Sequence, residues 1–208
     1  AYGNDVTSNV ILNNGNGIEI TDTSHDNRVF DNEISGNGNG IRVSQSWNNT
    51  IVGNDILSNT ISGIVFYSYY YLSTNNVIFH NNFINNTQQV ISDGYHDIWD
   101  NGHPSGGNYW SNYTGPDLYS GPYQNETGSD RIGDTPYVID AENRDNYPLM
   151  YQYSLWDLSG PVMWVPDLKC DIRDIALVAK LYGSVENDGT YDRRADLTGP
   201  TYTVPDGK

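Results

Sequence analysis

The sequence predicts an all-β protein: a right-handed parallel β-helix of about four rungs, with a capping loop region and a small helical segment at its C-terminal end. Three observations support this fold class. An Asn-rich unit recurs about every 23 residues over the first 100, apolar and polar residues alternate within each unit, and Asn or Gly interrupts each alternating run. Such runs favour short strands separated by bends, and the density of Asn and Gly disfavours helices.

The repeat is clearest when four segments are aligned. Asn4–Ile11 matches Asn27–Ile34, Asn49–Ile56 and Asn76–Phe83, at offsets of 23, 22 and 27 residues. Three short strands per unit bury little alone, but stacked units align equivalent side chains into interior columns. The three expected columns are Val6, Val29, Ile51 and Ile78; Ile11, Ile34, Ile56 and Phe83; and Ile18, Ile41, Ile64 and Val90.

Asparagine also recurs in register. The three Asn columns are Asn4, Asn27, Asn49 and Asn76; Asn9, Asn32, Asn54 and Asn81; and Asn14, Asn37, Asn59 and Asn86. Asn tolerates the left-handed backbone of a sharp bend, and its amide can donate to the rung above while accepting from the rung below. The alternative, a disordered polar tract, does not explain why the Asn columns keep step with the apolar ones.

Composition narrows the function classes. The 208 residues carry a formal net charge of −16, and Arg28 and Arg42 are the sole Lys or Arg residues among the first 100. A nucleic-acid partner is therefore not expected, because phosphate binding needs a basic face. There is no apolar run long enough to cross a membrane, and the single Cys170 cannot form an internal disulfide. The acidity fits an extracellular or cell-surface location that is rich in calcium.

Four N-glycosylation sequons are compatible with that location without arguing for it, because a chain so rich in Asn, Ser and Thr has about as many by chance. Their acceptor residues are Asn48, Asn85, Asn112 and Asn125.

The repeat over residues 4–100 resembles those of carbohydrate-binding and sugar-hydrolase β-helix families and of NosD-like periplasmic or surface proteins. From 101 to 155 the period is lost, and Gly107–Asp117, Arg131–Asp140 and Asp145–Met150 resemble the tail that closes NosD-like β-helices in archaeal surface proteins. We expect apolar side chains of this region to plug the open end of the helix. They are Tyr109, Trp110, Tyr137, Val138, Ile139, Tyr147 and Leu149.

In the family that this tail resembles, an Asp-rich loop precedes the closing segment. Glu126, Asp130 and Asp134 stand at the corresponding positions here, in a loop that contains glycine. Hard oxygen ligands at i, i+4 and i+8 suit calcium, which is the cofactor that we expect. A solvated acidic turn is the alternative.

The last part of the chain, residues 156–208, holds a second repeat. Asp157–Lys169 recurs as Asp196–Lys208 at an offset of 39, and Asp171–Gly183 between them predicts an amphipathic helix. The arrangement resembles a dockerin-type calcium loop and helix, and we expect it to be incomplete because the second copy stops at Lys208. The resemblance implies the calcium ligands Asp157, Asp167, Asp171 and Asp174. A Gly-Pro insertion in the loop departs from the pattern, as does Leu168 where Gly is expected.

Catalysis is not expected. A polysaccharide lyase on this fold needs a cationic base, and residues 1–100 contain no Lys. An inverting hydrolase needs clustered carboxylates. The nearest approach to such a cluster is Asp22, His25, Asp26 and Asp31, with Glu19 and Glu33 near them. Solvated turns explain these residues better, and His80, His96 and His103 do not favour the copper site that the NosD name suggests.

A tyrosine-rich insertion lengthens the third unit. The segment Tyr67–Tyr71 can form an aromatic loop that stacks on sugar rings or on another subunit, and Trp47 lies one rung earlier. Packing of the rings against the helix flank is the alternative. The candidate contact residues are Tyr67, Tyr69, Tyr70 and Tyr71.

These features together predict a non-catalytic extracellular or cell-surface structural protein that self-assembles into a filament or surface layer, or adheres. A carbohydrate-binding or carbohydrate-active module is the alternative. The expected partners are copies of the chain stacked head to tail, because both ends look uncovered, or other surface proteins and glycans. A trimmed fragment would also leave both ends uncovered.

Overall fold

The computed structural model of the chain describes residues 1–68, 72–93 and 96–154. The chain divides into two units, of which Ala1–Tyr153 is the one that the structure describes. The predicted calcium ligands and helix of the C-terminal part lie outside the described residues, as do Tyr69, Tyr70 and Tyr71.

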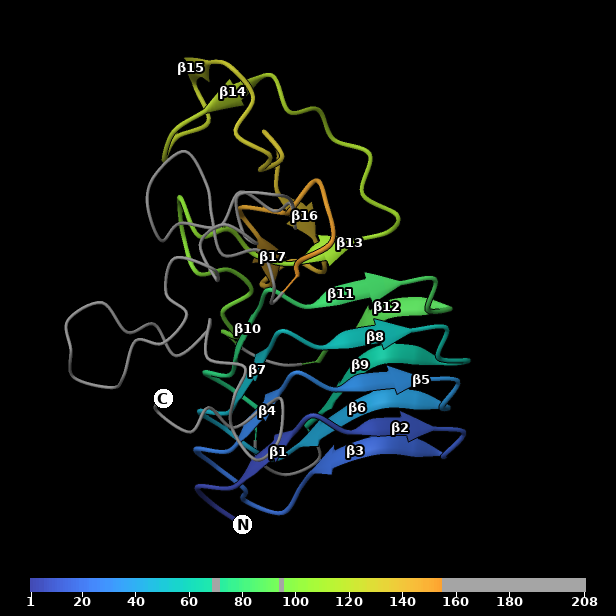
Figure 1. Cartoon of the computed structure of the whole chain (residues 1–208). Helices are drawn as coiled ribbons and strands as arrows, with labels where there is room; N and C mark the ends of the chain where they lie inside the picture. The colour runs from blue at the N-terminus through green and yellow to red at the C-terminus, as the bar shows by residue number, and fades with distance from the viewer. Residues whose placement is uncertain (69–71, 94–95, 155–208) are drawn as a thin grey trace, which may run out of the picture. The chain divides into compact units, whose positions relative to one another are not determined.

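The first unit is a parallel β-solenoid of about four turns, in which each turn adds one strand to each of three sheets (Figure 1). The first sheet contains β1 (Asp5–Thr7), β4 (Arg28–Phe30), β7 (Thr50–Val52) and β10 (Val77–Phe79). The second sheet contains β2 (Val10–Leu12), β5 (Glu33–Ser35), β8 (Asp55–Leu57), β11 (Asn82–Ile84) and β13 (Tyr109–Trp110). The third sheet contains β3 (Asn16–Ile20), β6 (Asn39–Ser44), β9 (Ser62–Tyr67) and β12 (Gln88–Ile91).

The strand register confirms the three predicted apolar columns. Val29 pairs with Ile51 in the first sheet, Ile34 with Ile56 in the second, and the columns continue in both directions as predicted. In the third sheet Ile18, Ile41, Ile64 and Val90 are successive partners. These columns form one buried core along the solenoid, which supplies its hydrophobic stabilisation.

The Asn columns are confirmed as ladders of hydrogen bonds. Asn54 is fully buried; its Oδ1 accepts from the backbone N–H of Asn32 at 3.1 Å and from the Asn32 Nδ2 at 2.9 Å. Its own Nδ2 donates to the Oδ1 of Asn81 at 2.9 Å. Each ladder therefore has a direction, with donors on the N-terminal side of every bond and acceptors on the C-terminal side.

The prediction that the ladder Asn residues themselves adopt the left-handed backbone conformation is wrong. No ladder Asn has a positive φ; that conformation belongs to the residue just before it, such as Ser8 (57°) before Asn9 or His80 (57°) before Asn81. The bend is thus made one position earlier, and the ladder Asn is selected for its amide hydrogen bonds. Varied residues fill the bend position because it faces outward and needs little more than tolerance of the left-handed region.

Glycine in the third sheet has a different cause, which is close approach between turns. A Cβ on Gly40 would lie 2.5 Å from the carbonyl oxygen of Gly63, and a Cβ on Gly17 would lie 2.6 Å from that of Gly40. These contacts are shorter than van der Waals distance, so a side chain at this column would push neighbouring turns apart.

Residues 96–153, which we call the cap, close the C-terminal end of the rungs. They contain β13 and two hairpins, β14 (Tyr119–Ser120) with β15 (Glu126–Thr127) and β16 (Tyr137–Val138) with β17 (Arg144–Asp145). Trp110 continues the core column by stacking on Phe83 at 4.3 Å, and Tyr137 stacks on Trp110 at 4.2 Å. Flat rings of this kind finish a column that no further strand would cover.

The predicted plug is confirmed in part. Trp110 and Leu149 are buried, and Tyr137 and Ile139 pack against the core. Val138 is 67% exposed, because it faces outward from the short strand β16. The plug also contains Trp99 and Ile132, which were not among the residues predicted for it.

Within the described ranges we find no helix with the length and apolar character needed to span a membrane.

Candidate functional site

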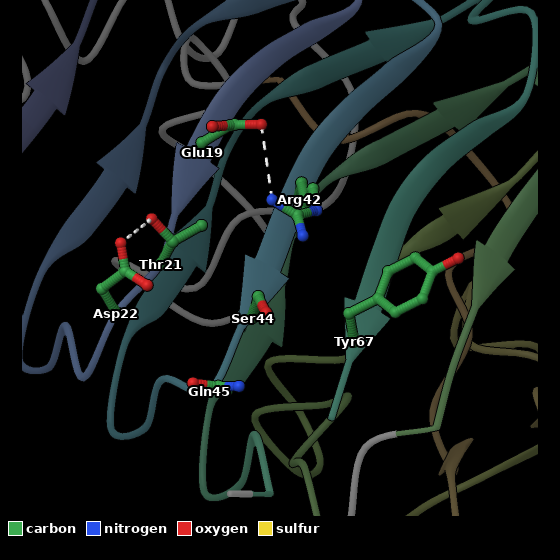
Figure 2. A pocket seen from close by; sticks show the side chains of 7 residues that line it. All are labelled: Glu19, Thr21, Asp22, Arg42, Ser44, Gln45 and Tyr67. Carbon is green, nitrogen blue, oxygen red and sulfur yellow. Dashed lines mark hydrogen bonds and ion pairs between the residues drawn. The ribbon is translucent and has the colours of Figure 1, made fainter. Parts of the chain in front are cut away.

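A groove of about 420 Å³ lies on the outward face of the third sheet (Figure 2). It crosses three consecutive turns of the solenoid. Its lining residues are Glu19, Thr21, Asp22, Arg42, Ser44, Gln45 and Tyr67.

Strand alternation places these side chains. Ile18 and Ile41 point into the core, so Glu19 and Arg42, the next residues on β3 and β6, point outward as register partners. Ser44 at the end of β6 is likewise the partner of Tyr67 at the end of β9. The periodic core therefore fixes where the groove residues stand, although it does not choose their identity.

The turns that follow β3 and β6 complete the groove wall. Asp22 and Gln45 both have a positive φ, of 56° and 51°, and lie at the same point of successive turns. The backbone N–H of Gln45 donates to the carbonyl of Tyr67 at 3.3 Å, which ties the second turn to the third. The groove thus has a hydrogen-bonded frame, and its polar side chains face solvent.

Arg42 is the central charge of the groove. Its Nη1 lies 3.5 Å from Glu19 Oε1, and its Cζ lies 5.7 Å from the centre of the Tyr67 ring. The Glu19 carboxylate also accepts from Asn16 Nδ2. Because both charged side chains are partly exposed, their ion pair adds little stability and orients the guanidinium between an acceptor and an aromatic ring.

Among the predicted aromatic contacts, Tyr67 lies in the groove with 53% of its surface exposed. Trp47 stacks on His25 at 5.4 Å, and His25 stacks on Tyr2 at 5.5 Å, on the turn before the first sheet.

The candidate catalytic residues do not come together at one site. Glu19 and Asp22 line the groove, whereas His25 and Asp26 bond to each other at 2.8 Å on the following turn. Asp31 lies after β4, where burial raises the pKa of its carboxyl and the charge of Arg28 lowers it. Glu33 lies on β5, in the second sheet.

The predicted calcium ligands of the cap have other partners. Asp134 accepts from the backbone N–H groups of Leu118 and Tyr119, at 2.9 and 3.0 Å. Asp130 accepts from the N–H of Gly121 and Ile132, and Glu126 is exposed on β15. Throughout the described ranges, no three His, Cys, Asp or Glu side chains are grouped as a metal site would need.

Asp117 is an acidic residue of the cap that was not among the predicted site residues. The Asp117 carboxylate accepts from Ser129 Oγ and from the backbone N–H groups of Asp130 and Arg131, at 2.6, 3.1 and 2.9 Å. Its position after Gly-Pro was a signal for a turn, but the partners lie more than ten residues along the chain.

All four sequon asparagines are exposed, which keeps glycosylation possible at each: Asn48, Asn85, Asn112 and Asn125.

Three of the histidines lie at separate places. His80 Nε2 lies 2.8 Å from the Ser105 carbonyl oxygen, its ring stacks on Tyr153, and burial lowers its pKa. His103 Nε2 lies 3.3 Å from an Asp130 oxygen, and His25 belongs to the Tyr2 stack.

Residues 1–115 match the family described as "Periplasmic copper-binding protein (NosD)". No curated protein and no solved structure gives a significant match. Copper favours grouped imidazole and sulfur ligands, and within the described ranges no three His, Cys, Asp or Glu side chains are grouped. The family match nevertheless agrees with the parallel solenoid and covers more than half of the chain. The chain therefore belongs to the NosD family of parallel β-helix proteins.

Proposed function

We propose that this chain is a non-catalytic adhesion module of a periplasmic or cell-surface protein, and that it binds a neutral sugar chain in the groove on the third sheet. One observation carries the proposal. An exposed aromatic ring, a guanidinium, a carboxylate and several hydroxyl and amide groups converge on one groove of about 420 Å³. The word "periplasmic" in the family description supports the location.

The chemistry of these groups suits a sugar. Sugar hydroxyls donate and accept hydrogen bonds, and the C–H face of a sugar ring packs on aromatic side chains. Tyr67 offers a half-exposed ring, Arg42 offers donors, and Glu19 offers an acceptor only 3.5 Å away. Ser44 and Gln45 add a hydroxyl and an amide on the same wall.

Charge favours a neutral ligand over an acidic one. The groove holds two carboxylates, on Glu19 and Asp22, against the single guanidinium of Arg42. The whole chain carries a formal charge of −16. This field repels acidic polysaccharides and phosphate esters, so selectivity for neutral glycans follows.

The surroundings of Glu19 support a binding role rather than hydrolysis. A glycosidase keeps its general acid in an apolar pocket beside a second carboxyl group. The side chain of Glu19 is 46% exposed and is paired with Arg42. Arg42 is the sole Lys or Arg that lines the groove, and this pairing also makes it a poor base for a lyase.

Self-assembly is a second candidate function. Strands β1, β2 and β3 are edge strands of their sheets, and such edges pair readily with other chains. Stacking of copies head to tail has to displace or bypass the cap at the other end. Electron microscopy of the concentrated protein tests this candidate, since single particles under all conditions would argue against it.

Calcium binding also stays a proposal. Asp130 and Asp134 would have to exchange backbone N–H groups for the ion, and the exposed Glu126 would have to turn toward it. A melting temperature that does not change when a chelator is added would contradict calcium binding.

Binding to an array of neutral and acidic glycans, followed by calorimetry on the best ligand, tests the proposed function. Tyr67→Ala and Arg42→Gln should each weaken binding by about fivefold, because each removes a contact worth roughly 1 kcal/mol. Tyr123→Ala is the matched control, since Tyr123 is 84% exposed and lies in the loop of the β14–β15 hairpin. Absence of neutral-glycan binding, or equal affinity in all variants, would refute the proposal.

A further inference from the structure

Two buried carboxyl groups lie at the C-terminal ends of two Asn ladders. Asp97 ends the ladder of Asn4, Asn27, Asn49 and Asn76, and its Oδ1 accepts from the Asn76 N–H at 2.8 Å and from the Asn76 Nδ2 at 3.0 Å. The second ladder continues from Asn81 to Asn108, and the Asn108 N–H donates to Asp145 at 2.7 Å. Both carboxyl groups are over nine-tenths buried.

The second oxygen of each carboxyl group has a different environment. Within the described part of the chain, Asp97 Oδ2 is buried and has no hydrogen-bond partner. The Asp145 carboxyl group has more hydrogen-bond partners, because its oxygens also accept from Trp110 Nε1 at 2.9 Å and from the Tyr147 N–H at 3.0 Å. An ionised Asp97 therefore leaves part of its charge unsolvated, which is costly in a protein interior.

The charged groups that act on these two carboxyls have the same sign as they do. The carboxylate of Asp140, from the turn between β16 and β17, acts on Asp97, and that of Asp100 acts on Asp145. Arg144 and His96, the neighbours along the chain, are exposed while the aspartates beside them are buried. Burial and the neighbouring negative charges therefore both favour the protonated forms of Asp97 and Asp145.

We propose that the cap is a proton-dependent latch: it closes the core tightly while Asp97 and Asp145 are protonated, and it loosens when they release their protons to solvent. The closed cap keeps Trp99 and Trp110 over the core. Loosening therefore uncovers the aromatic end of the solenoid while the rungs, whose ladders are neutral amides, keep their structure.

The direction of the pH effect follows from the protonation states. Burial raises the pKa of Asp97 and of Asp145 from 3.8 to about 7. A raised pKa in the closed cap means that closure binds protons, so its stabilisation is complete below about pH 4 and is lost as the pH rises to about 7. Above that range both forms are ionised and the effect levels off.

Amide and indole hydrogen exchange of the whole chain, corrected for intrinsic rates, tests the latch. Between about pH 5 and about pH 8, protection of the Asn76 N–H and the Trp110 indole N–H should fall by at least about tenfold. The N–H of Asn32, which donates to Asn54 within the rungs, serves as the internal reference and should keep its protection.

Two variants separate the latch from a general pH effect. Asp97→Asn keeps the acceptor for Asn76 and should flatten the pH profile of that N–H, while the Trp110 profile persists. Asp5→Asn removes the same charge from an exposed position on β1 and should change neither profile. Equal pH profiles in the rungs and the cap, or a profile at Asn76 that survives Asp97→Asn, would overturn the proposal.

Discussion

The rungs and the cap bury polar groups in two different ways. In the rungs, each interior ladder Asn accepts from the turn before it and donates to the turn after it, as Asn54 does between Asn32 and Asn81. In the cap, the first two ladders end at Asp97 and Asp145, which accept without donating further along the ladder. A neutral amide both accepts and donates, so it can be repeated along a ladder. An ionised carboxyl group only accepts, so it can end a ladder but not continue it.

The third ladder shows another ending. Asn86 Nδ2 donates to Gln89 Oε1 at 2.9 Å, and Gln89 Nε2 passes the chain of bonds to Ser111 Oγ at 3.0 Å. A neutral amide thus ends the third ladder where carboxyl groups end the other two. The residue type that ends each ladder therefore depends on which hydrogen-bond donors and acceptors the cap places next to that ladder.

The largest effect should come from placing a cap residue in the middle of a ladder. Asn54→Asp replaces the Nδ2 donor by an oxygen that faces Asn81 Oδ1 and the carbonyls of Val29 and Val52. We expect a loss of about 3–5 kcal/mol in unfolding free energy at neutral pH. Chemical denaturation measures it, and Asp97→Asn, the reverse change at a ladder end, should cost less than about 1 kcal/mol. Similar losses for both would break the distinction between interior and terminal positions.

A glycine of the rungs should come next. Gly40→Ala puts a methyl group 2.5 Å from the Gly63 carbonyl oxygen, and we expect a loss of about 1–3 kcal/mol because the backbone has to move. Gly15→Ala is the matched control, since a Cβ there has no neighbour within 4 Å. Thermal unfolding of the pair checks this, and equal melting temperatures would show that the turns are not tightly spaced.

A cap residue in a fully bonded position should give a smaller change. Asp145→Asn keeps one acceptor oxygen and puts an NH₂ group where the other accepted a hydrogen bond. We expect a loss of about 1–2 kcal/mol at about pH 5, where charge matters least. Trp fluorescence during denaturation reports it through Trp110, which bonds to Asp145. An unchanged midpoint would mean that these hydrogen bonds do not hold the cap.

The smallest effect on stability belongs to the groove. Tyr67→Ala and Arg42→Gln alter outward side chains joined by an exposed ion pair and a ring contact, so the unfolding free energy should stay within about 0.5 kcal/mol. The same denaturation curves measure it. A larger loss would show that the groove residues serve the fold rather than a ligand.

Much of the solenoid followed from the spacing of residues. Ile34, Ile56 and Phe83 recur at one point of the unit, and Asn32, Asn54 and Asn81 at another, which was enough to predict their registers. The predicted backbone conformation of the ladder Asn residues was wrong, because the left-handed conformation lies one residue before each of them. Repetition reveals which positions are equivalent, but not which backbone conformation each one adopts.

The groove was predicted only through Tyr67. Arg42 and Glu19 were noted in the sequence for other reasons, as a scarce cation and as a turn carboxylate. Their meeting at 3.5 Å depends on the parallel register of β3 and β6, which brings residues 23 positions apart side by side. The same holds for Asp130 and Asp134, whose carboxylate oxygens accept from backbone N–H groups that spacing alone cannot locate.

The sequence by itself determined the repeat length, the interior columns and the Asn ladders, because stacked turns turn a linear period into contacts between equivalent residues. Only the tertiary structure decided what ends each ladder, which acidic residues are buried and which side chains share the groove. The cap does not repeat, so its contacts join residues such as Asn108 and Asp145 whose separation follows no period.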